Sequence, residues 1–233
     1  MRPQSTWTLT AGLLVIIGTS GCSKRPDRAV PEPAPVGNRA ESRAEEPQPE
    51  ATRPHRRQKS AIARIEELGG QYSADRKNPD KPVVVSVDLR GTQPSDSDLA
   101  FLGDLGHLKE LYLSSAPVTS AALEHLAGLT NLRKLYLSGT RIDDAGLELL
   151  KGLTSLERLS LSSTEITDAG LEHVQGLNNL QELVLYNTHV TDEGLKHLKS
   201  LTKLRKLQLS GTHVTEEGVK ELQQALPHCE IRR

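Results

Sequence analysis

Apolar residues recur along most of this chain with a period of 24. The copies begin at Val84, Leu108, Leu132, Leu156, Leu180 and Leu204. When Leu132 is counted as position 1, apolar residues return at positions 1, 4, 6, 11, 16, 19 and 22. The spacing of positions 4 and 6 predicts a short strand with both side chains inward, and the spacing by threes from position 16 predicts a short helix or 3₁₀ turn. Residues 84–227 therefore predict six strand-and-helix coils stacked as a solenoid.

The repeat also carries a recognisable signature. Each copy opens L-x-x-L-x-L and several continue T-x-I-T-D-x-G-L-x-x-L, which resembles the leucine-rich-repeat family, and within it bacterial surface proteins and lipoproteins of the ribonuclease-inhibitor-like and cysteine-containing variants. The resemblance implies an α/β solenoid with a curved parallel sheet on the concave face and short helices on the convex face. The first copy departs, with Pro94 at position 11 and Asp98 where glycine is usual, as a terminal capping repeat requires.

Polar residues recur in the repeat as well. Threonine at position 9 is expected to bond the backbone as the chain leaves the strand, and the residues at position 12 are good helix N-caps. The acidic residue at position 13 suits the positive start of a helix, and glycine at position 15 permits close approach between coils. The position 12 residues are Ser95, Thr119, Asp143, Thr167, Thr191 and Thr215. A calcium site is not favoured, because the glycine-rich nonapeptide of calcium-binding repeats is absent.

Both ends of the array carry cap sequences. Residues 60–83 predict an N-terminal cap, in which Ser60 caps a helix that ends at Gly69 and Gly70. Residues 228–233 predict a C-terminal cap that restarts the repeat as a truncated seventh strand. Cys229 is interpreted as a small, half-buried residue of this cap.

Residues 1–22 form a secretory signal pattern. Its apolar run is about ten residues, half of what a spanning helix needs, and the small residues before Cys22 resemble the lipobox of bacterial lipoproteins, although Thr19 stands where leucine is favoured. The resemblance implies that Cys22 is acylated and anchors the protein in a membrane. Ser23 in place of aspartate favours the outer membrane or cell surface. The alternative is ordinary cleavage and release as a periplasmic or secreted protein.

Residues 23–59 contain seven prolines and no leucine, isoleucine or aromatic residue, so they predict a disordered linker. Charge divides along the chain: residues 1–59 carry a net +4 and residues 60–233 a net −5. Neither value is the strongly basic footprint of nucleic-acid binding, and no nucleic-acid partner is expected.

Positions 3, 5 and 7 are expected to face outward from the sheet, and three of the four tyrosines fall there. Tyrosine is enriched at interfaces because it joins apolar area to a polar tip. The predicted partner-binding residues are Glu110, Tyr112, Lys134, Tyr136, Arg158, Glu182, Val184, Tyr186 and Lys206. The charges at position 3 have two interpretations, recognition of a partner or lateral ion pairs that only solubilise the face.

The sequence contains no nucleophile elbow, phosphate loop or cysteine-paired metal motif, so neither catalysis nor a cofactor nor a metal is expected. Histidines recur at positions 10 and 18 without the H-x-x-x-H spacing of zinc sites, and solvated histidines are favoured. The predicted function is that of an extracytoplasmic, lipid-anchored leucine-rich-repeat protein that binds a protein or peptide through the concave face. The alternative is a structural or adhesive envelope component that self-associates without a discrete ligand.

Overall fold

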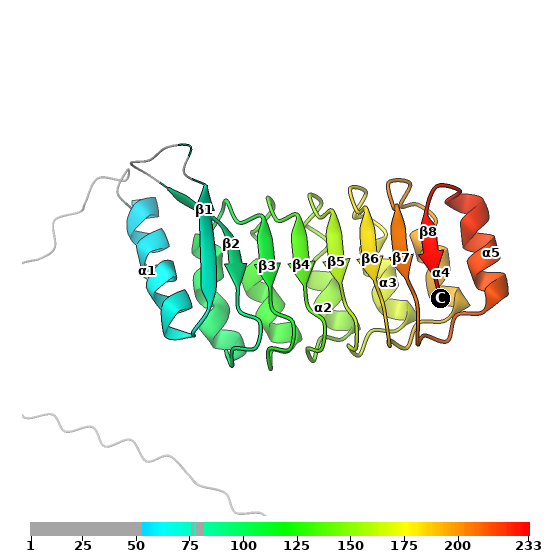
Figure 1. Ribbon diagram of the computed structural model, residues 1–233, viewed down its shortest axis with the longest axis horizontal. Coiled ribbons are helices and arrows are strands. Elements are labelled where there is room, and N and C mark those ends of the chain that lie inside the picture. Colours follow the sequence, from blue (N-terminus) through cyan, green and yellow to red (C-terminus); the bar gives the residue numbers. More distant parts are fainter. Residues whose placement is uncertain (1–52, 76, 78–81) are drawn as a thin grey trace, which may run out of the picture. The chain divides into compact units, whose positions relative to one another are not determined.

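The computed structural model describes residues 53–75, 77 and 82–233, which form a stack of coils that each add one strand to a common sheet (Figure 1). The predicted signal peptide, the lipidation residue Cys22 and residues 23–52 of the predicted linker lie outside the described residues.

The sheet has eight strands in sequence order. They are β1 (Gln71–Asp75), β2 (Val83–Asp88), β3 (Glu110–Tyr112), β4 (Lys134–Tyr136), β5 (Arg158–Ser160), β6 (Glu182–Val184), β7 (Lys206–Gln208) and β8 (Glu230–Arg232). Strands β2 to β8 are parallel, and each residue pairs with the residue 24 positions later, as Leu111 does with Leu135. The period of the sequence is thus the register of the sheet, and the predicted α/β solenoid is confirmed.

The return segments cover one face of this sheet. They are η2 (Asp96–Asp104), η3 (Ser120–Leu126), α2 (Asp144–Leu149), α3 (Asp168–Val174), α4 (Asp192–Leu195) with η4 (Lys196–Leu198), and α5 (Glu216–Ala225). In Figure 1 those between β2 and β7 lie behind the strands, whereas α5 stands at the C-terminal end of the stack beside β8. The opposite face, called here the open face, is covered by no helix of the described residues.

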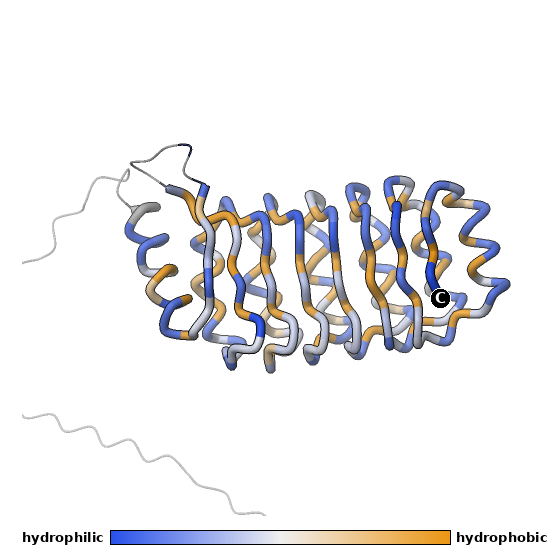
Figure 2. Tube along the Cα trace, viewed as in Figure 1, coloured by the Kyte–Doolittle hydropathy of each residue, from blue (hydrophilic) through white to orange (hydrophobic). Residues whose placement is uncertain are grey.

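The core is the set of predicted apolar positions. Leu135 and Leu137 of the third copy are fully buried, as are their equivalents in the other copies, and Figure 2 shows the apolar residues recurring from coil to coil. Buried position 9 threonines bond the backbone as predicted: Thr164 Oγ1 donates to the Leu161 carbonyl at 2.6 Å. This bond lets a polar side chain remain in the core, because an unpaired buried hydroxyl would be destabilising.

The N-terminal cap differs from the prediction at its start. Helix α1 spans Arg53–Glu67, so it begins seven residues before the predicted cap at Ser60, and residues 53–59 are helix rather than disordered linker. Pro54 is compatible with this start because the first turn needs no intrahelical N–H donor there. Gln58 then ties the helix to β2, since its amide donates to the Pro82 carbonyl at 2.7 Å and accepts from the Val84 N–H at 3.1 Å.

Strand β1 was not predicted either, because its sequence lacks apolar alternation and two of its five residues are charged or amide side chains. It pairs antiparallel with β2. The predicted end of the helix is correct: α1 stops at Glu67, and Gly69 takes the left-handed conformation, φ 74°, that glycine allows at a helix end.

Asp98, the departure from glycine in the first copy, holds α1 onto the coils. Its carboxylate forms an ion pair with Arg64 of α1 and accepts hydrogen bonds from the side chain and backbone of Ser95. The bonds from Ser95, followed by the bond from Arg64, lower the pKa of Asp98 to about 2. The exception in the repeat pattern is therefore the docking point of the cap.

The C-terminal cap forms the predicted strand, but Cys229 is fully part of the core and not half-buried as predicted. Strand β8 pairs in parallel with β7 and continues the same register. Cys229 is 4% exposed and carries a free thiol, and burial raises its pKa to about 11.

Candidate functional site

Carboxylates at position 13 link successive coils and so hold the open face in register. Asp168 accepts two hydrogen bonds from Thr191 of the next coil, one from its N–H at 2.7 Å and one from its hydroxyl at 2.6 Å. The equivalent pairs are Asp96–Thr119, Asp144–Thr167 and Asp192–Thr215. Each of these threonines also caps the helix that follows it, as predicted. One pair of residues thus stabilises both the helix start and the contact between coils.

One link has its two residue types exchanged. Between the second and third coils, Ser120 stands at position 13 and Asp143 at position 12, and the serine hydroxyl donates to the carboxylate at 2.6 Å. A Cβ at the neighbouring Gly146 would lie 2.6 Å from Ser120 Oγ, which explains the glycine at position 15. From the sequence, the acids were predicted only to suit helix starts. The exchange of Ser120 and Asp143, 23 residues apart, is the signal that could have revealed the link.

The predicted binding residues divide into two groups on the open face. In the N-terminal half, the rings of Tyr112 on β3 and Tyr136 on β4 stack with centroids 4.8 Å apart and planes 5° apart. The guanidinium of Arg90 lies over the Tyr112 ring at 5.1 Å, a cation–π contact. The structure therefore brings these two tyrosines together, as their positions on adjacent strands predicted.

The polar groups around this pair bind one another. The Tyr112 hydroxyl donates to Glu110 at 3.0 Å, Lys134 donates to Glu110 at 2.6 Å, and Arg90 pairs with Asp88 at 2.5 Å. Burial, followed by the bond to Glu110, raises the pKa of Tyr112 to about 12. The bond from Lys134 lowers the pKa of Glu110. We call Asp88, Arg90, Glu110, Tyr112, Lys134 and Tyr136 the tyrosine cluster; its members are largely occupied with each other.

Tyr186 stands apart from this cluster. It lies on the turn that leaves β6 and is 52% exposed; only Tyr72, at 40%, is comparably exposed among the large apolar side chains of the described residues. The following residue, Asn187, has φ 55°, and position 8 is left-handed in all six coils. The glycine, serine or asparagine found at position 8 indicates a sharp turn that presents position 7 outward. This turn could have been predicted from the sequence but was not. Val184 lies on β6 itself and is half-buried.

The charges at position 3 form lateral ion pairs, one of the two interpretations left open by the sequence. Besides Lys134–Glu110, the single carboxylate of Glu182 serves two cations, Arg158 at 3.6 Å and Lys206 at 3.3 Å. These pairs are partly exposed and contribute little stability.

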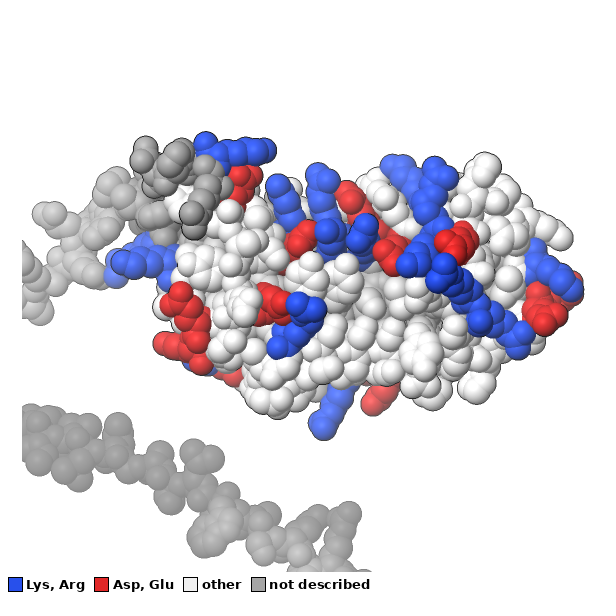
Figure 3. Space-filling model, viewed as in Figure 1, with Lys and Arg blue, Asp and Glu red and all other residues white. Residues whose placement is uncertain are grey.

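Cations exceed anions around Glu182. Lys203 donates only to the Asn179 side-chain oxygen, at 2.6 Å, and the Arg205 side chain has no hydrogen bond or ion pair with any described residue. We call Arg158, Glu182, Lys203, Arg205 and Lys206 the β7 basic cluster. Figure 3, which looks onto the open face, shows basic side chains running across its C-terminal half.

The same asymmetry holds across the whole solenoid. Within residues 84–233, positions 1–7, which form the strands and their edges, hold nine basic and five acidic residues, whereas positions 12–22 on the helix side hold four basic and fourteen acidic. The small net charge of the chain therefore hides a basic open face and an acidic helix face. Such a field attracts anionic partners to the open face.

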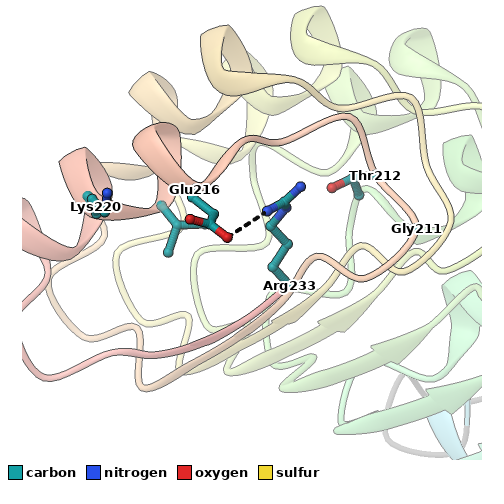
Figure 4. Close-up of a pocket in the computed structure, with 6 residues that line it drawn as sticks. Gly211, Thr212, Glu216, Lys220 and Arg233 are labelled. Carbon is teal, nitrogen blue, oxygen red and sulfur yellow. Dashed lines mark ion pairs between the residues drawn. The ribbon is translucent and has the colours of Figure 1, made fainter.

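The other features of the described residues are a cleft at the C-terminal end and several histidines. A cleft of about 650 Å³ at the C-terminal end is lined by Gly211, Thr212, Glu216, Val219, Lys220 and Arg233 (Figure 4). Arg233 faces Glu216 across it at 3.8 Å. The described residues hold no group of three or more histidine, cysteine or acidic side chains placed for a metal. The rings of His189 and His213 lie 6.4 Å apart, and His173 Nδ1 is buried without a partner in the described part.

Comparison with known proteins supports the fold. The model of the leucine-rich-repeat family matches residues 130–190 and 154–214. The structure of an internalin (InlF) from Listeria monocytogenes is similar at 26% identity and a TM-score of 0.50, over 57% of this chain and 36% of that one. This chain thus spans little more than a third of that protein. An internalin C2 from the same species shares 22% identity, with a TM-score of 0.47, over 73% of this chain and 80% of that one. No curated protein sequence matches the chain.

None of the helices in the described part is long and apolar enough to cross a bilayer.

Proposed function

We propose that this chain is a leucine-rich-repeat protein that binds a protein or peptide partner through the open face of its sheet, without catalysis; the match of residues 130–214 to the family supports this. The observation that carries the proposal is the difference between the two faces. Helices cover one, whereas six short parallel strands from β3 to β8 present their outward side chains on the other, under no covering element of the described residues. With strands spaced ~4.8 Å apart, these six strands extend over ~24 Å, which suits an extended peptide or a small epitope.

The proposed binding residues are those predicted from the sequence, with unequal roles. Tyr186 and the β7 basic cluster are accessible and incompletely paired. The tyrosine cluster supplies a preformed, rigid surface beside them. Rigid side chains lose little conformational entropy on binding. A partner is therefore expected to pack against the outer side of the tyrosine rings and not to insert between the side chains of the cluster.

We further propose that the protein works outside the cytoplasm and is anchored through acylated Cys22, at the outer membrane or cell surface. The signal pattern of residues 1–22 supports export, and the small residues before Cys22 support lipidation. Release into the periplasm or medium is the alternative. Incorporation of labelled palmitate into the wild type and its loss in Cys22→Ala would support the anchor, whereas equal labelling would contradict it.

A site-specific photocrosslinker distinguishes the two faces. Benzoylphenylalanine is placed at Val184 on the open face or, as a matched control, at exposed Glu172 on the helix face, and the full-length chain is irradiated in its native cells. We expect a discrete protein adduct from position 184 and none from position 172. Adducts of equal yield from both positions, or from position 172 alone, would contradict binding through the open face.

The same experiment tests the alternative of self-association. An adduct at twice the mass of the chain, whose mass spectrum contains only peptides of this protein, would favour a self-assembling envelope component over one that binds a separate partner. Sedimentation velocity at rising protein concentration then checks whether assembly occurs without any other molecule.

A further inference from the structure

We propose that the C-terminal half of the open face, from β5 to β7, is a docking surface for an acidic polypeptide segment that also carries an apolar side chain. The inference rests on the proposed function and adds the chemistry of the partner. Two features on the same face lead to it: the β7 basic cluster and the exposed ring of Tyr186.

The cluster has cations that the described residues do not neutralise. Glu182 is shared between Arg158 and Lys206, and Arg205 has no charged partner in the described part of the chain. The other acidic residues near this edge are already engaged, since Glu157 pairs with Arg133 at 3.0 Å and Glu230 with Arg232 at 2.6 Å. Carboxylates from a partner would complete this arrangement, and Arg205 offers a planar donor fork suited to them.

Tyr186 provides the apolar contact. It stands four residues after Glu182 and two beyond the end of β6, and at ~3.3 Å per extended residue the two ends of the site lie up to ~13 Å apart. An extended segment of about five residues laid along β6 therefore spans from the cations to the ring. Between them lie Val184 and Gln208, both half-buried and short enough to leave the path open.

The aromatic end favours a polypeptide over another polyanion. A sulfated polysaccharide or a phosphate-rich surface would use the cations but carries no apolar side chain to cover a half-exposed tyrosine ring. A polypeptide supplies both kinds of side chain within a few residues. Its attraction to the face is also long-ranged, because the strand side of the solenoid is basic while the helix side is acidic.

The test uses three fluorescent ten-residue peptides with the same phenylalanine and with glutamate, glutamine or lysine at the other alternate positions. Binding of each peptide to the full-length chain is followed by fluorescence anisotropy at 50 mM and 300 mM salt. The variants are Arg205→Glu and its matched control Arg141→Glu, a likewise exposed arginine whose side chain also lacks a partner among the described residues. Tyr186→Ala probes the apolar end.

We expect the glutamate peptide alone to bind, with affinity at least fivefold weaker for Arg205→Glu and for Tyr186→Ala, unchanged for Arg141→Glu, and weaker at high salt. Equal losses in Arg205→Glu and Arg141→Glu would overturn the site, because net charge alone would then explain binding. Absence of glutamate-peptide binding would also overturn it, as would binding of heparin with the same dependence on Arg205 but none on Tyr186.

The failure of this inference can be told apart from failure of the proposed function. If all three peptides bind equally and Tyr186→Ala abolishes binding, the acidic preference is wrong while the open face remains a peptide-binding surface. If no peptide binds and position 184 gives no crosslinked partner in cells, both are wrong.

Discussion

The two halves of the open face use the same kinds of side chain to different ends. In the tyrosine cluster, Tyr112 stacks on Tyr136, and its hydroxyl binds the carboxylate that also accepts from Lys134. In the C-terminal half, Tyr186 stacks on no ring of the described residues and is 52% exposed, while one carboxylate serves two cations. The difference comes from the adjacent coil, because a residue's lateral neighbour is the residue 24 positions away. A tyrosine on a solenoid face is available to a partner only if the residues at the same position of the adjacent coils do not stack on its ring.

The largest effect is expected in the core, where the two halves should behave alike. Leu135 lies beneath the tyrosine cluster and Leu207 beneath the β7 basic cluster, and both are fully buried. Replacing either by alanine should lower the free energy of unfolding by ~3 kcal/mol, through lost burial and a cavity. Urea unfolding followed by circular dichroism measures both. If only one variant is destabilised, the halves differ in their packing and not merely at their surface.

The tyrosines should separate the halves. Tyr112→Ala should lower the free energy of unfolding by ~2 kcal/mol, because it removes a stacked ring and leaves Glu110 with one bond fewer. Tyr186→Ala should change it by less than ~0.5 kcal/mol, since that ring is mostly in solvent. The same urea titration decides, and equal losses in the two variants would contradict the division proposed here.

A smaller effect is expected at the link between the second and third coils, where Ser120 and Asp143 exchange the residue types found at the other links. Ser120→Asp alone should cost ~1 kcal/mol, because it places a second carboxylate against Asp143 and removes the hydroxyl donor. Adding Asp143→Thr should recover most of the loss by creating the Asp–Thr link found between other coils, such as Asp168–Thr191. The measurement is the coupling free energy between the two substitutions, obtained from the free energies of unfolding of the four proteins in the double-mutant cycle. Additive effects would show that the two residues do not interact.

The smallest effect is the contribution of Tyr112, in the N-terminal half, to the pH dependence of stability. The pKa of Tyr112 is raised to about 12, above the ordinary tyrosine value near 10, so the phenol is neutral in both states below pH 10 and stability is fully present there. Between pH 10 and about 12 the unfolded chain ionises first, and the free energy of unfolding falls. We expect a shallower fall in Tyr112→Phe, measured by urea unfolding at pH 9, 10 and 11. Parallel curves for both proteins would contradict this role of Tyr112.

Most of the fold could be predicted because the repeat supplies the same information six times. Leucines such as Leu135 specify the interior, and the caps such as Thr167 specify where each helix starts. The errors fall where there is no repetition. Helix α1 begins earlier than Ser60 because Gln58 binds β2, and β1 forms because β2 offers it an edge. Neither contact joins residues that are close in sequence, and neither is repeated from coil to coil.

The candidate site was predictable in its position and less so in its chemistry. Alternation along the strand places Glu110, Tyr112 and Val184 outward, and the structure has them half-exposed on the open face. The alternation does not say that Arg90 covers the Tyr112 ring or that Glu182 is divided between two cations. Those outcomes depend on side-chain length and reach across neighbouring strands.

The sequence alone determined which side chains are inside and that residues 24 apart are neighbours, because burying a leucine at each of seven positions leaves a coil one way to close. Only the tertiary structure decided which polar groups are satisfied within the chain and which remain for a partner. A hydrogen bond needs a donor and acceptor within about 3 Å, a condition set by the stacking of coils rather than by any one of them. That is why Tyr112 and Tyr186, which both fall at outward positions of the repeat, differ in the molecule.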